Sequence, residues 1–447
     1  MNQKRLVVLG SGESGIGAAI LGVKENYDVF VSDVGTITKK YKDVLLKESI
    51  LFEENKHTES LILNADVVVK SPGIPDSSPL IIKLAKAGIL VVSEIEFGSW
   101  FTNATIIGIT GSNGKTTTAS LTYHLLKAGG LNVGLAGNIG ESFARQVAEC
   151  DFDIYVLELS SFQLDGIKNI RFDVSVLLNI TPDHLDRYEY NFDNYIDSKF
   201  GIIKNVDKNT VFIYNGDDDN ICKSRHDVTF PSKSYSFKYS ELYGSGAGID
   251  DSHIAVDINN LVRISVGASK LRGKHNSYNI MASVSVANVF NIEQKTIVKA
   301  LGTFNSIEHR LESVLVLNGI EYINDSKATN VDSTWYALDS IVDNIIWVAG
   351  GVDKGNDYSQ LLPLVKSKVH GIICLGKDNQ KLHTAFEPYV KQIEDALSAE
   401  EAVRKATDMA SEGFTVLLSP ACASFDLFCN YEDRGIKFKK AINNITK

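Results

Sequence analysis

One glycine-rich segment carries the residue types that bind nucleotide phosphates. It reads Thr110-Gly111-Ser112-Asn113-Gly114-Lys115-Thr116-Thr117 and follows the apolar run Ile106–Ile109. Backbone N–H groups of such a loop can close on phosphate oxygens, and a following helix adds the positive end of its dipole. Lys115 can reach the β- and γ-phosphates, and the Thr116 hydroxyl can bind Mg²⁺. The segment therefore predicts that the chain binds ATP or GTP and transfers or hydrolyses phosphate.

The spacing of this segment leaves one alternative open. Ile109 stands where the common Walker pattern has its first glycine. A glycine turn with a surface lysine would produce the same letters. The strand before the loop and the run Lys115-Thr116-Thr117 after it favour phosphate binding.

An acidic residue farther along could complete a metal site. Glu158 follows the expected strand Ile154–Leu157. A parallel sheet would place this carboxylate beside the glycine loop, where a ligand for Mg²⁺ is needed. An acid at an exposed sheet edge is the alternative, but the apolar neighbours of Glu158 favour a site.

His184 and Lys199 are more ambiguous. His184 follows Pro182 and could ligate a metal or only cap a loop. Lys199 lies in the helical run Asp193–Ile203, and a lysine on an amphipathic helix is usually solvated.

The N-terminal segment contains a nucleotide fingerprint. The pattern Gly10-x-Gly12-x-x-Gly15 follows an apolar strand, and Asp33 ends the next one. The pattern predicts a pyrophosphate at a helix N-terminus without specifying which nucleotide. Tight strand–helix packing without a ligand is the alternative. Ser71-Pro72-Gly73 follows a later strand and is equally compatible with a ligand loop and a rigid turn.

Three polar segments near the C-terminus each follow a short apolar strand. They are Asn324–Asn330, Gly350–Lys354 and Ser419–Asp426. Because carboxyl ends of parallel strands meet at one sheet edge, we expect these segments to converge. Their lysines, hydroxyls and amides suit a carboxylate or phosphate ligand. Ordinary loop polarity is the alternative, and three such loops disfavour it.

The composition excludes several classes of protein. The 447 residues carry a net charge of −10, which disfavours a general nucleic-acid binder. The five cysteines are widely spaced without a C-x-x-C pair, which argues against a disulfide framework or a zinc knuckle. No apolar run approaches the ~20 residues that span a bilayer. We expect a cytoplasmic protein with no membrane insertion.

The rhythm of strands and helices predicts an α/β protein of three domains. We expect a Rossmann-like domain over residues 1–93, a central P-loop ATPase-like domain over 94–304 and a Rossmann-like domain over 305–447. The central domain includes a stretch of short alternating strands from about residue 210, which predicts a small antiparallel sheet.

Together these motifs resemble the Mur ligases, ATP-dependent amide-bond-forming enzymes of peptidoglycan synthesis. The resemblance covers nearly the whole chain. The motifs shared with the wider family are Gly111–Thr117, Glu158 with Ser160-Ser161, His184, His275-Asn276-x-x-Asn279 and His309-Arg310. Asn324–Asn330 and Leu418–Asp426 resemble the D-glutamate-adding branch more narrowly.

The resemblance implies a role for each matching residue. The residues implied in ATP binding are Gly111, Ser112, Asn113, Gly114, Lys115, Thr116, Thr117, Asn279, Arg310 and Asp325. Those implied near the UDP-linked substrate are Glu13, Ser14, Asp33, Ser71, Pro72, Gly73 and Asn138. Those implied on the D-glutamate side are Lys327, Thr329, Lys354, Ser424 and Tyr431.

The resemblance also implies two Mg²⁺ ions. Thr116 and Glu158 would bind one ion, and His184 and Lys199 the other, with Lys199 carbamylated by CO₂. Such a lysine bears a carboxylate in place of an ammonium. The implied catalytic residues are Lys115, Glu158, His184, Lys199 and His309.

The implied reaction joins two small molecules. The carboxylate of UDP-N-acetylmuramoyl-L-alanine attacks the γ-phosphorus of ATP to give an acyl phosphate, which the amine of D-glutamate then attacks. The implied protein is a monomer whose domains close during the reaction.

Three rival interpretations remain. Folylpolyglutamate synthetases add glutamate by similar chemistry, but the N-terminal nucleotide domain and Asn324–Asn330 disfavour that assignment. A dinucleotide-dependent oxidoreductase would rest on Gly10–Gly15 alone. A non-catalytic nucleotide switch would not need the C-terminal polar loops.

Overall fold

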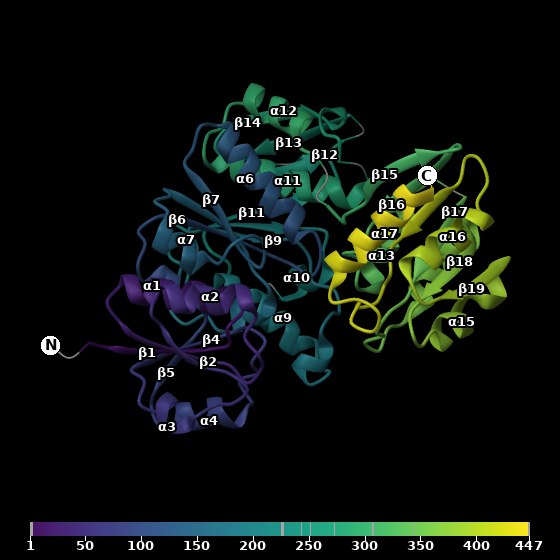
Figure 1. The fold of residues 1–447 in the computed structure, drawn as a ribbon. Helices are drawn as coiled ribbons and strands as arrows, with labels where there is room; N and C mark the ends of the chain where they lie inside the picture. The colour runs from purple at the N-terminus through teal and green to yellow at the C-terminus, as the bar shows by residue number, and fades with distance from the viewer. Residues whose placement is uncertain are drawn as a thin grey trace. The chain divides into compact units, whose positions relative to one another are not determined.

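A computed structural model describes residues 3–224, 228–242, 244–250, 252–271, 273–305, 308–342 and 344–445. The described chain is an α/β protein built on three sheets (Figure 1). It forms two compact units. The first contains Met1–Pro182, Asn191–Ala268 and Tyr278–Thr303, and the second contains Asp183–Tyr190, Ser269–Ser277 and Phe304–Lys447.

The first sheet is fully parallel, with the strand order β3-β2-β1-β4-β5. Its strands are β1 (Arg5–Leu9), β2 (Asp28–Ser32), β3 (Leu51–Glu53), β4 (Val67–Lys70) and β5 (Leu90–Val92). The helices of this segment are α1 (Glu13–Lys24), α2 (Lys39–Lys47), α3 (Glu59–Ile62), α4 (Pro79–Lys86) and α5 (Glu94–Ser99). Helices α1 and α2 lie on one face of the sheet and α3 and α4 on the other (Figure 1). Apolar residues of β1, β2 and β4 pack against α3 and α4 to form a core.

The second sheet has nine strands in the order β14-β13-β12-β11-β10-β9-β6-β8-β7. They are β6 (Thr105–Thr110), β7 (Val133–Gly137), β8 (Ile154–Glu158), β9 (Val174–Leu177), β10 (Val211–Asn215), β11 (Lys233–Lys238), β12 (Gly246–Ile249), β13 (His253–Asp257) and β14 (Leu261–Ser265). The predicted antiparallel strands are β12 to β14, and they continue the main sheet at its edge. Strands β10 and β11 also lie in the stretch for which the sequence predicts an antiparallel sheet, but they pair in parallel.

The helices of this region cover the nine-stranded sheet and its connections. They are α6 (Lys115–Ala128), α7 (Phe143–Glu149), α8 (Ser161–Asp165), α9 (Phe192–Phe200), α10 (Asp219–Ser224), α11 (Lys274–Val289) and α12 (Gln294–Thr303). Short 3₁₀ turns span η1 (Leu185–Tyr188), η2 (Gly201–Ile203) and η3 (Val266–Ala268). Helix α1 packs closely on α7, since a Cβ at Gly17 would lie 1.9 Å from Ser142 Oγ. This packing joins the first two sheets in one compact unit.

The third sheet has the order β15-β16-β20-β17-β18-β19 and is parallel except for the β15–β16 hairpin. Its strands are β15 (Glu312–Leu317), β16 (Ile320–Asn324), β17 (Ile345–Ala349), β18 (Val369–Leu375), β19 (Gln392–Ala396) and β20 (Thr415–Leu418). Its helices are α13 (Val331–Ser340), α14 (Leu362–Lys368), α15 (Gln380–Phe386), α16 (Ala399–Met409) and α17 (Tyr431–Ile445), with 3₁₀ turns η4 (Tyr358–Leu361) and η5 (Glu387–Tyr389).

Both faces of the third sheet are covered. Ile346 and Val348 of β17 pack into a core with α16 and α17, whereas Ile345 and Trp347 pack into a second core with α13 to α15. This alternation follows from the two-residue repeat of a strand, and it explains why β17 is apolar at every position.

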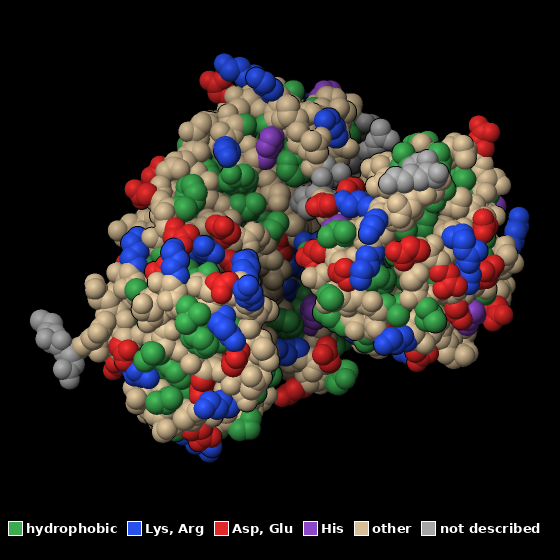
Figure 2. All heavy atoms as spheres, viewed as in Figure 1, with side chains coloured by type: hydrophobic (Ala, Val, Ile, Leu, Met, Phe, Trp, Pro, Cys, Tyr) green, Lys and Arg blue, Asp and Glu red, His purple; other side chains and the backbone are tan. Residues whose placement is uncertain are grey.

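Two further features concern the surface and the helices. Acidic and basic side chains are interspersed on the face drawn in Figure 2. Among the described residues, no helix combines the length and apolar character needed to cross a bilayer.

Candidate active site

The glycine loop between β6 and α6 has the shape of a phosphate cradle. Gly114 has a φ of +82° and caps α6. An added Cβ there would lie 2.3 Å from Asn279 Oδ1, and one at Gly111 would lie 2.9 Å from Leu178 Cβ. Only glycine satisfies both the positive φ and the close neighbours. The loop is therefore a strand–glycine–helix turn, as the sequence predicts.

A segment after β9 anchors this loop. The backbone N–H of Asn113 donates to Asn179 Oδ1 at 2.7 Å. The hydroxyl of Ser112 donates to the carbonyl oxygen of Thr181 at 2.8 Å and lies 3.0 Å from Tyr195 Oη. These bonds fix the loop before any ligand binds.

Lys115 lies over the loop at the start of α6. Its ammonium donates to the carbonyl oxygens of Gly111 and Ser112 at 2.8 and 2.7 Å. The positive charge is thus held at the loop that the sequence predicts to bind phosphate.

The expectation that Lys199 is solvated is wrong. Lys199 is only 1% exposed. The ammonium donates to the carbonyl oxygen of Gly111 at 2.9 Å and to Thr110 Oγ1 at 3.3 Å, and it lies 5.2 Å from the ring centroid of Tyr195. A buried cation needs such acceptors. Helical spacing could not reveal them, because they belong to the end of β6 and the first residue of the loop after it.

Glu158 ends β8 directly beside β6, where Ile109 is its register partner. The carboxylate is buried, and its Oε1 accepts a hydrogen bond from Asn138 Nδ2 at 2.9 Å. Its Oε2 has no hydrogen-bond partner among the described residues. A buried carboxylate oxygen without a donor is costly unless a cation completes it. The Glu158 carboxylate therefore fits a Mg²⁺ ion, and Thr116 as a second ligand remains a prediction.

His184 belongs to a different compact unit from the other predicted metal ligands. It has a φ of +52° and belongs to the second compact unit, whereas Lys199 belongs to the first. Its Nε2 lies 3.7 Å from Asp183 Oδ2. The pairing of His184 and Lys199 as ligands of a second Mg²⁺ remains a prediction.

The predicted UDP-side residues gather at one edge of the first sheet. Glu13, at the start of α1, and the loop residues Asp33 and Ser71 come after the neighbouring strands β1, β2 and β4. Burial opposes the charge of Asp33, but hydrogen bonds from the Ser11 hydroxyl and the N–H groups of Gly35 and Ser11 outweigh it and lower the pKa of the carboxyl. The Asp33 carboxylate thereby holds Ser11 of the glycine turn in place.

The remaining UDP-side residues have distinct surroundings. Glu13 Oε2 accepts a hydrogen bond from Tyr41 Oη at 3.1 Å, and Ser14 is the next residue of α1. Asn138 follows β7 in the second sheet, where its side chain holds Glu158. Asn138 therefore lies at the phosphate loop rather than at the first sheet.

The three C-terminal polar loops do converge. Strands β16, β20 and β17 are neighbours in the third sheet, and a loop follows each of them. Asn330 and Lys354 from two of the loops both contact Asp183, at 3.1 and 3.2 Å. The sequence prediction of a shared edge is confirmed.

Arg434 on α17 binds all three loops, and the sequence did not single it out. The residue is 1% exposed, and its guanidinium donates to the carbonyl oxygens of Ser326, Gly350 and Cys422 at 2.9, 3.3 and 3.2 Å. Burial lowers the pKa of this guanidinium to about 10. Arg434 stands among other charged residues in the sequence of α17, as an exposed arginine would, so nothing in the sequence indicates that it is buried.

His309, Arg310 and Asp325 form a group at the same edge. Burial raises the pKa of Asp325 to about 6, against the opposing effect of Arg310, whose Nη1 lies 4.0 Å from Asp325 Oδ1. Burial lowers the pKa of His309, whose Nδ1 lies 2.8 Å from Asn324 Nδ2 and so accepts its hydrogen.

The residues that are predicted to bind D-glutamate lie on or next to the same loops. Lys327 Nζ lies 5.5 Å from the ring centroid of Tyr431. Ser424 is buried, and Thr329 lies in the same loop as Lys327. The arrangement presents two lysines and two hydroxyls near one buried arginine, which suits a dicarboxylate ligand.

Comparison with known families identifies the family of the chain. Models of the MurD N-terminal domain, the Mur ligase middle domain and the Mur ligase glutamate ligase domain match residues 5–79, 109–287 and 309–422. A protein of Christiangramia forsetii named UDP-N-acetylmuramoylalanine–D-glutamate ligase is 53% identical over 444 residues, covering 99% of this chain and 100% of that one.

The chain belongs to the Mur ligase family.

As a Mur ligase, it is an ATP-dependent amide-bond-forming ligase. A Bacteroides thetaiotaomicron protein with the same name as the first relative is 48% identical and covers 99% of this chain and 100% of its own length. The solved structure of a pseudomurein peptide ligase type C from Methanothermus fervidus matches with a TM-score of 0.63 at 21% identity, over 99% of this chain and 100% of that one. That likeness concerns the fold.

Proposed function

We propose that this Mur ligase joins D-glutamate to UDP-N-acetylmuramoyl-L-alanine with release of ADP and phosphate. The observation that carries the proposal is the convergence of three loops bearing Lys327, Lys354 and Ser424 on one sheet edge tied by Arg434. The names of the relatives at 53% and 48% identity support the same substrates.

The phosphate loop would hold ATP. Lys115 would exchange its bonds to the Gly111 and Ser112 carbonyls for bonds to the β- and γ-phosphates. Asn279 lies against Gly114 of the loop and accepts a hydrogen bond from Thr118 of α6, and it would contact ATP there. The resemblance to the family also assigns Arg310 and Asp325 to ATP binding. Thr116 and Glu158 would hold Mg²⁺, which spreads the charge of the transferring phosphoryl group.

The reaction would activate a carboxylate by phosphorylation. A carboxylate oxygen of the alanyl substrate attacks the γ-phosphorus, and the bond to ADP breaks. The resulting acyl phosphate carries a leaving group that the free carboxylate lacks. The amine of D-glutamate then attacks the acyl carbon, phosphate departs, and the amine loses a proton. His309, whose neutral form is favoured by burial, is suited to position or accept that proton.

The amino-acid substrate would displace an internal carboxylate. Lys354 is paired with Asp183 in the described structure. A carboxylate of D-glutamate would take the place of Asp183 on Lys354, with Lys327, Thr329, Ser424 and Tyr431 completing the contacts. The sheet edge with Glu13, Ser14, Asp33 and Ser71–Gly73 would hold the UDP group.

Carbamylation of Lys199 forms part of the proposal. The Lys199 ammonium would first lose a proton, and the neutral amine would then add to CO₂ and release a second proton, so that a buried cation becomes an anionic carbamate. The present acceptors, Gly111 O and Thr110 Oγ1, suit the ammonium, so the carbamate would need to leave them and turn toward Mg²⁺. Intact-mass measurement at native pH would show the added CO₂ in active protein, and its absence from fully active protein would contradict the carbamate.

An assay of acceptor choice tests the proposed function. Purified protein receives ATP, Mg²⁺ and UDP-N-acetylmuramoyl-L-alanine with D-glutamate, L-glutamate or L-lysine, and ADP release is followed. We expect release with D-glutamate alone among the three. Equal rates with L-lysine, or release that ignores the amino acid, would refute the assignment. We expect a monomer by light scattering under the same conditions.

A further inference from the structure

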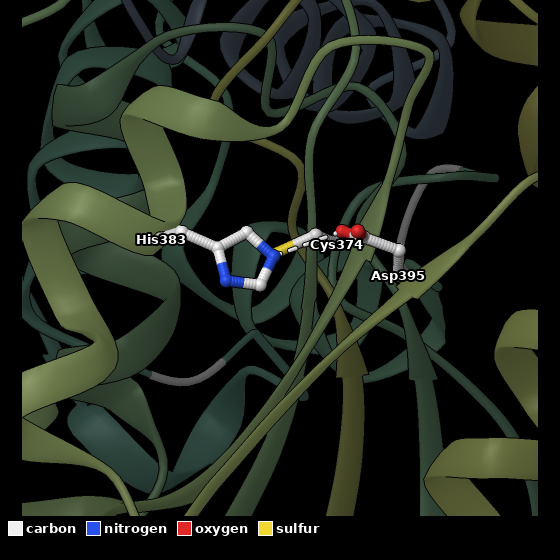
Figure 3. A group of neighbouring side chains, drawn as sticks. All are labelled: Cys374, His383 and Asp395. Carbon is white, nitrogen blue, oxygen red and sulfur yellow. Dashed lines mark hydrogen bonds and ion pairs between the residues drawn. The ribbon is translucent and has the colours of Figure 1, made fainter.

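A cluster of three different metal-binding side chains lies in the third sheet, outside the residues assigned to the reaction. Cys374 of β18, His383 of α15 and Asp395 of β19 each offer one ligand atom, and these atoms lie within 4.8 Å of one another. Figure 3 shows the His383 ring with a nitrogen turned to the Asp395 carboxylate. The Nε2–Oδ1 distance is 3.0 Å.

The fold brings these residues together from three elements. Cys374 and Asp395 are register partners on adjacent parallel strands, so both side chains point to the same face of the sheet. Helix α15 covers that face and supplies His383. Because the ligands lie on separate elements, no local cysteine spacing could have indicated the cluster.

The separations of the ligand atoms can be compared with those that zinc requires. Tetrahedral zinc with bonds of about 2.3 Å to sulfur and about 2.1 Å to nitrogen and oxygen places its ligand atoms about 3.3–3.6 Å apart. His383 Nε2 and Asp395 Oδ1 are 3.0 Å apart, and all three ligand atoms lie within 4.8 Å of one another, so the side chains would have to adjust around the ion. Thiolate, imidazole and carboxylate together are the donor set of zinc rather than of magnesium.

A neighbouring amide orients the carboxylate. Asn379 is buried, and its Nδ2 lies 2.9 Å from Asp395 Oδ1. The same Nδ2 lies 3.2 and 3.0 Å from the carbonyl oxygens of Cys374 and Gly376. Outer partners of this kind fix ligating groups in metal sites.

Burial and exposure differ among the three ligands. Cys374 is fully buried, whereas the Asp395 side chain is 58% exposed and that of His383 25%. A cation would therefore enter from the solvent side, between His383 and Asp395. Burial raises the pKa of the Cys374 thiol, so the thiol keeps its proton until a metal replaces it.

We propose that Cys374, His383 and Asp395 form a zinc site, with water as the fourth ligand. Binding forms one bond from zinc to each side chain, and the Cys374 proton passes to solvent. The site fastens α15 to β18 and β19. It goes beyond the ligase reaction and does not depend on the proposed substrates.

Cobalt titration of the full-length protein tests the site directly. The protein is stripped with a chelator, freed of it and kept in excess Mg²⁺ so that the phosphate loop does not contribute. Co²⁺ is then added. We expect a cobalt–thiolate charge-transfer band that saturates at one equivalent per chain and disappears when Zn²⁺ is added. Absence of the band would overturn the proposal.

Matched variants assign the ligands. We expect Cys374→Ser and His383→Gln to abolish the band. Cys150→Ser, which changes an exposed cysteine, and His370→Gln, on the same strand as Cys374, should keep it. A band that persists in Cys374→Ser would contradict the assignment.

A thermal measurement covers the case in which Cys374→Ser does not fold. Zn²⁺ binds only the folded chain and should raise the Tm of the unaltered protein. Asp395→Asn changes a largely exposed side chain, so the protein should fold and lose most of this increase. An equal increase in Asp395→Asn would refute the site.

Discussion

Asp183 and Lys354 form an ion pair in the second compact unit, with Oδ1 and Nζ 3.2 Å apart. The other carboxylate oxygen of Asp183 accepts a hydrogen bond from Asn330 Nδ2 at 3.1 Å. A single carboxylate thus joins two of the converging loops. Because Asp183 directly precedes His184, this pair links a proposed metal ligand to the proposed amino-acid site.

Removing the charge of Lys354 should weaken binding of the amino acid selectively. In Lys354→Met, we expect the KM for D-glutamate to rise roughly 10- to 100-fold, because a charge-assisted hydrogen bond contributes about 1.5–3 kcal/mol. The KM values for ATP and the UDP substrate should change little. Lys437→Met, which removes a surface pair with Asp433, serves as the control. An unchanged KM for D-glutamate would remove Lys354 from the site.

Replacing Arg434 should loosen the three loops together. A lysine donates from a single nitrogen, whereas the arginine guanidinium reaches the carbonyls of Ser326, Gly350 and Cys422 from two separate nitrogens. We expect Arg434→Lys to lower the free energy of unfolding by about 2–3 kcal/mol and to raise the KM for D-glutamate. Urea unfolding and steady-state kinetics measure the two effects. Normal KM in a destabilised variant would limit Arg434 to a role in stability.

Neutralising Glu158 should affect Mg²⁺ more than folding. Glu158→Gln keeps an oxygen to accept the Asn138 hydrogen bond but removes the negative charge. We expect kcat to fall at least about 100-fold and the Mg²⁺ concentration for half-maximal rate to rise. The Tm should change little. Glu149→Gln, in an exposed pair with Arg145, should leave all three quantities unaltered.

Glu94 should give the folded protein a distinct pH dependence. Burial raises the pKa of this carboxyl to about 7, although the Ser142 hydroxyl and the Ala144 N–H each donate to it at 2.6 Å. Between the ordinary pKa of 4.5 and about 7 the folded state binds more protons than the unfolded state. The stability contribution of Glu94 is therefore fully present below pH 4.5 and is lost as the pH rises to about 7.

The variant Glu94→Gln isolates this effect. Its amide oxygen can accept both hydrogen bonds without ionising. Relative to the unaltered protein, we expect its free energy of unfolding to be higher by roughly 3 kcal/mol at pH 8 and nearly equal at pH 4.5. A difference that is constant with pH would show that Glu94 ionises normally.

Features local in sequence could be predicted well. The apolar strand expected before Gly350–Lys354 is β17 (Ile345–Ala349), since a short run that is apolar at every position marks a strand buried on both faces. The glycine loop and Glu158 were also recognisable, because their roles depend on position at strand ends. The expected boundaries near residues 93 and 304 remain predictions.

Features set by tertiary contacts could not be predicted. Lys199 is buried because its ammonium meets the Gly111 carbonyl and the Thr110 hydroxyl, which lie 88 and 89 residues away in the chain, so helical spacing cannot show these contacts. Arg434 binds carbonyls of Ser326 and Gly350, which lie 108 and 84 residues away in the chain. No sequence pattern indicates that a side chain will donate a hydrogen bond to a distant backbone carbonyl.

The most direct test of the account follows an oxygen atom. UDP-N-acetylmuramoyl-L-alanine labelled with ¹⁸O in its carboxylate is incubated with the protein, ATP, Mg²⁺ and D-glutamate, and the released phosphate and the product are analysed by mass spectrometry. The account predicts one ¹⁸O atom in each phosphate and a product that contains D-glutamate. Unlabelled phosphate, which would come from attack by water on ATP, would contradict it.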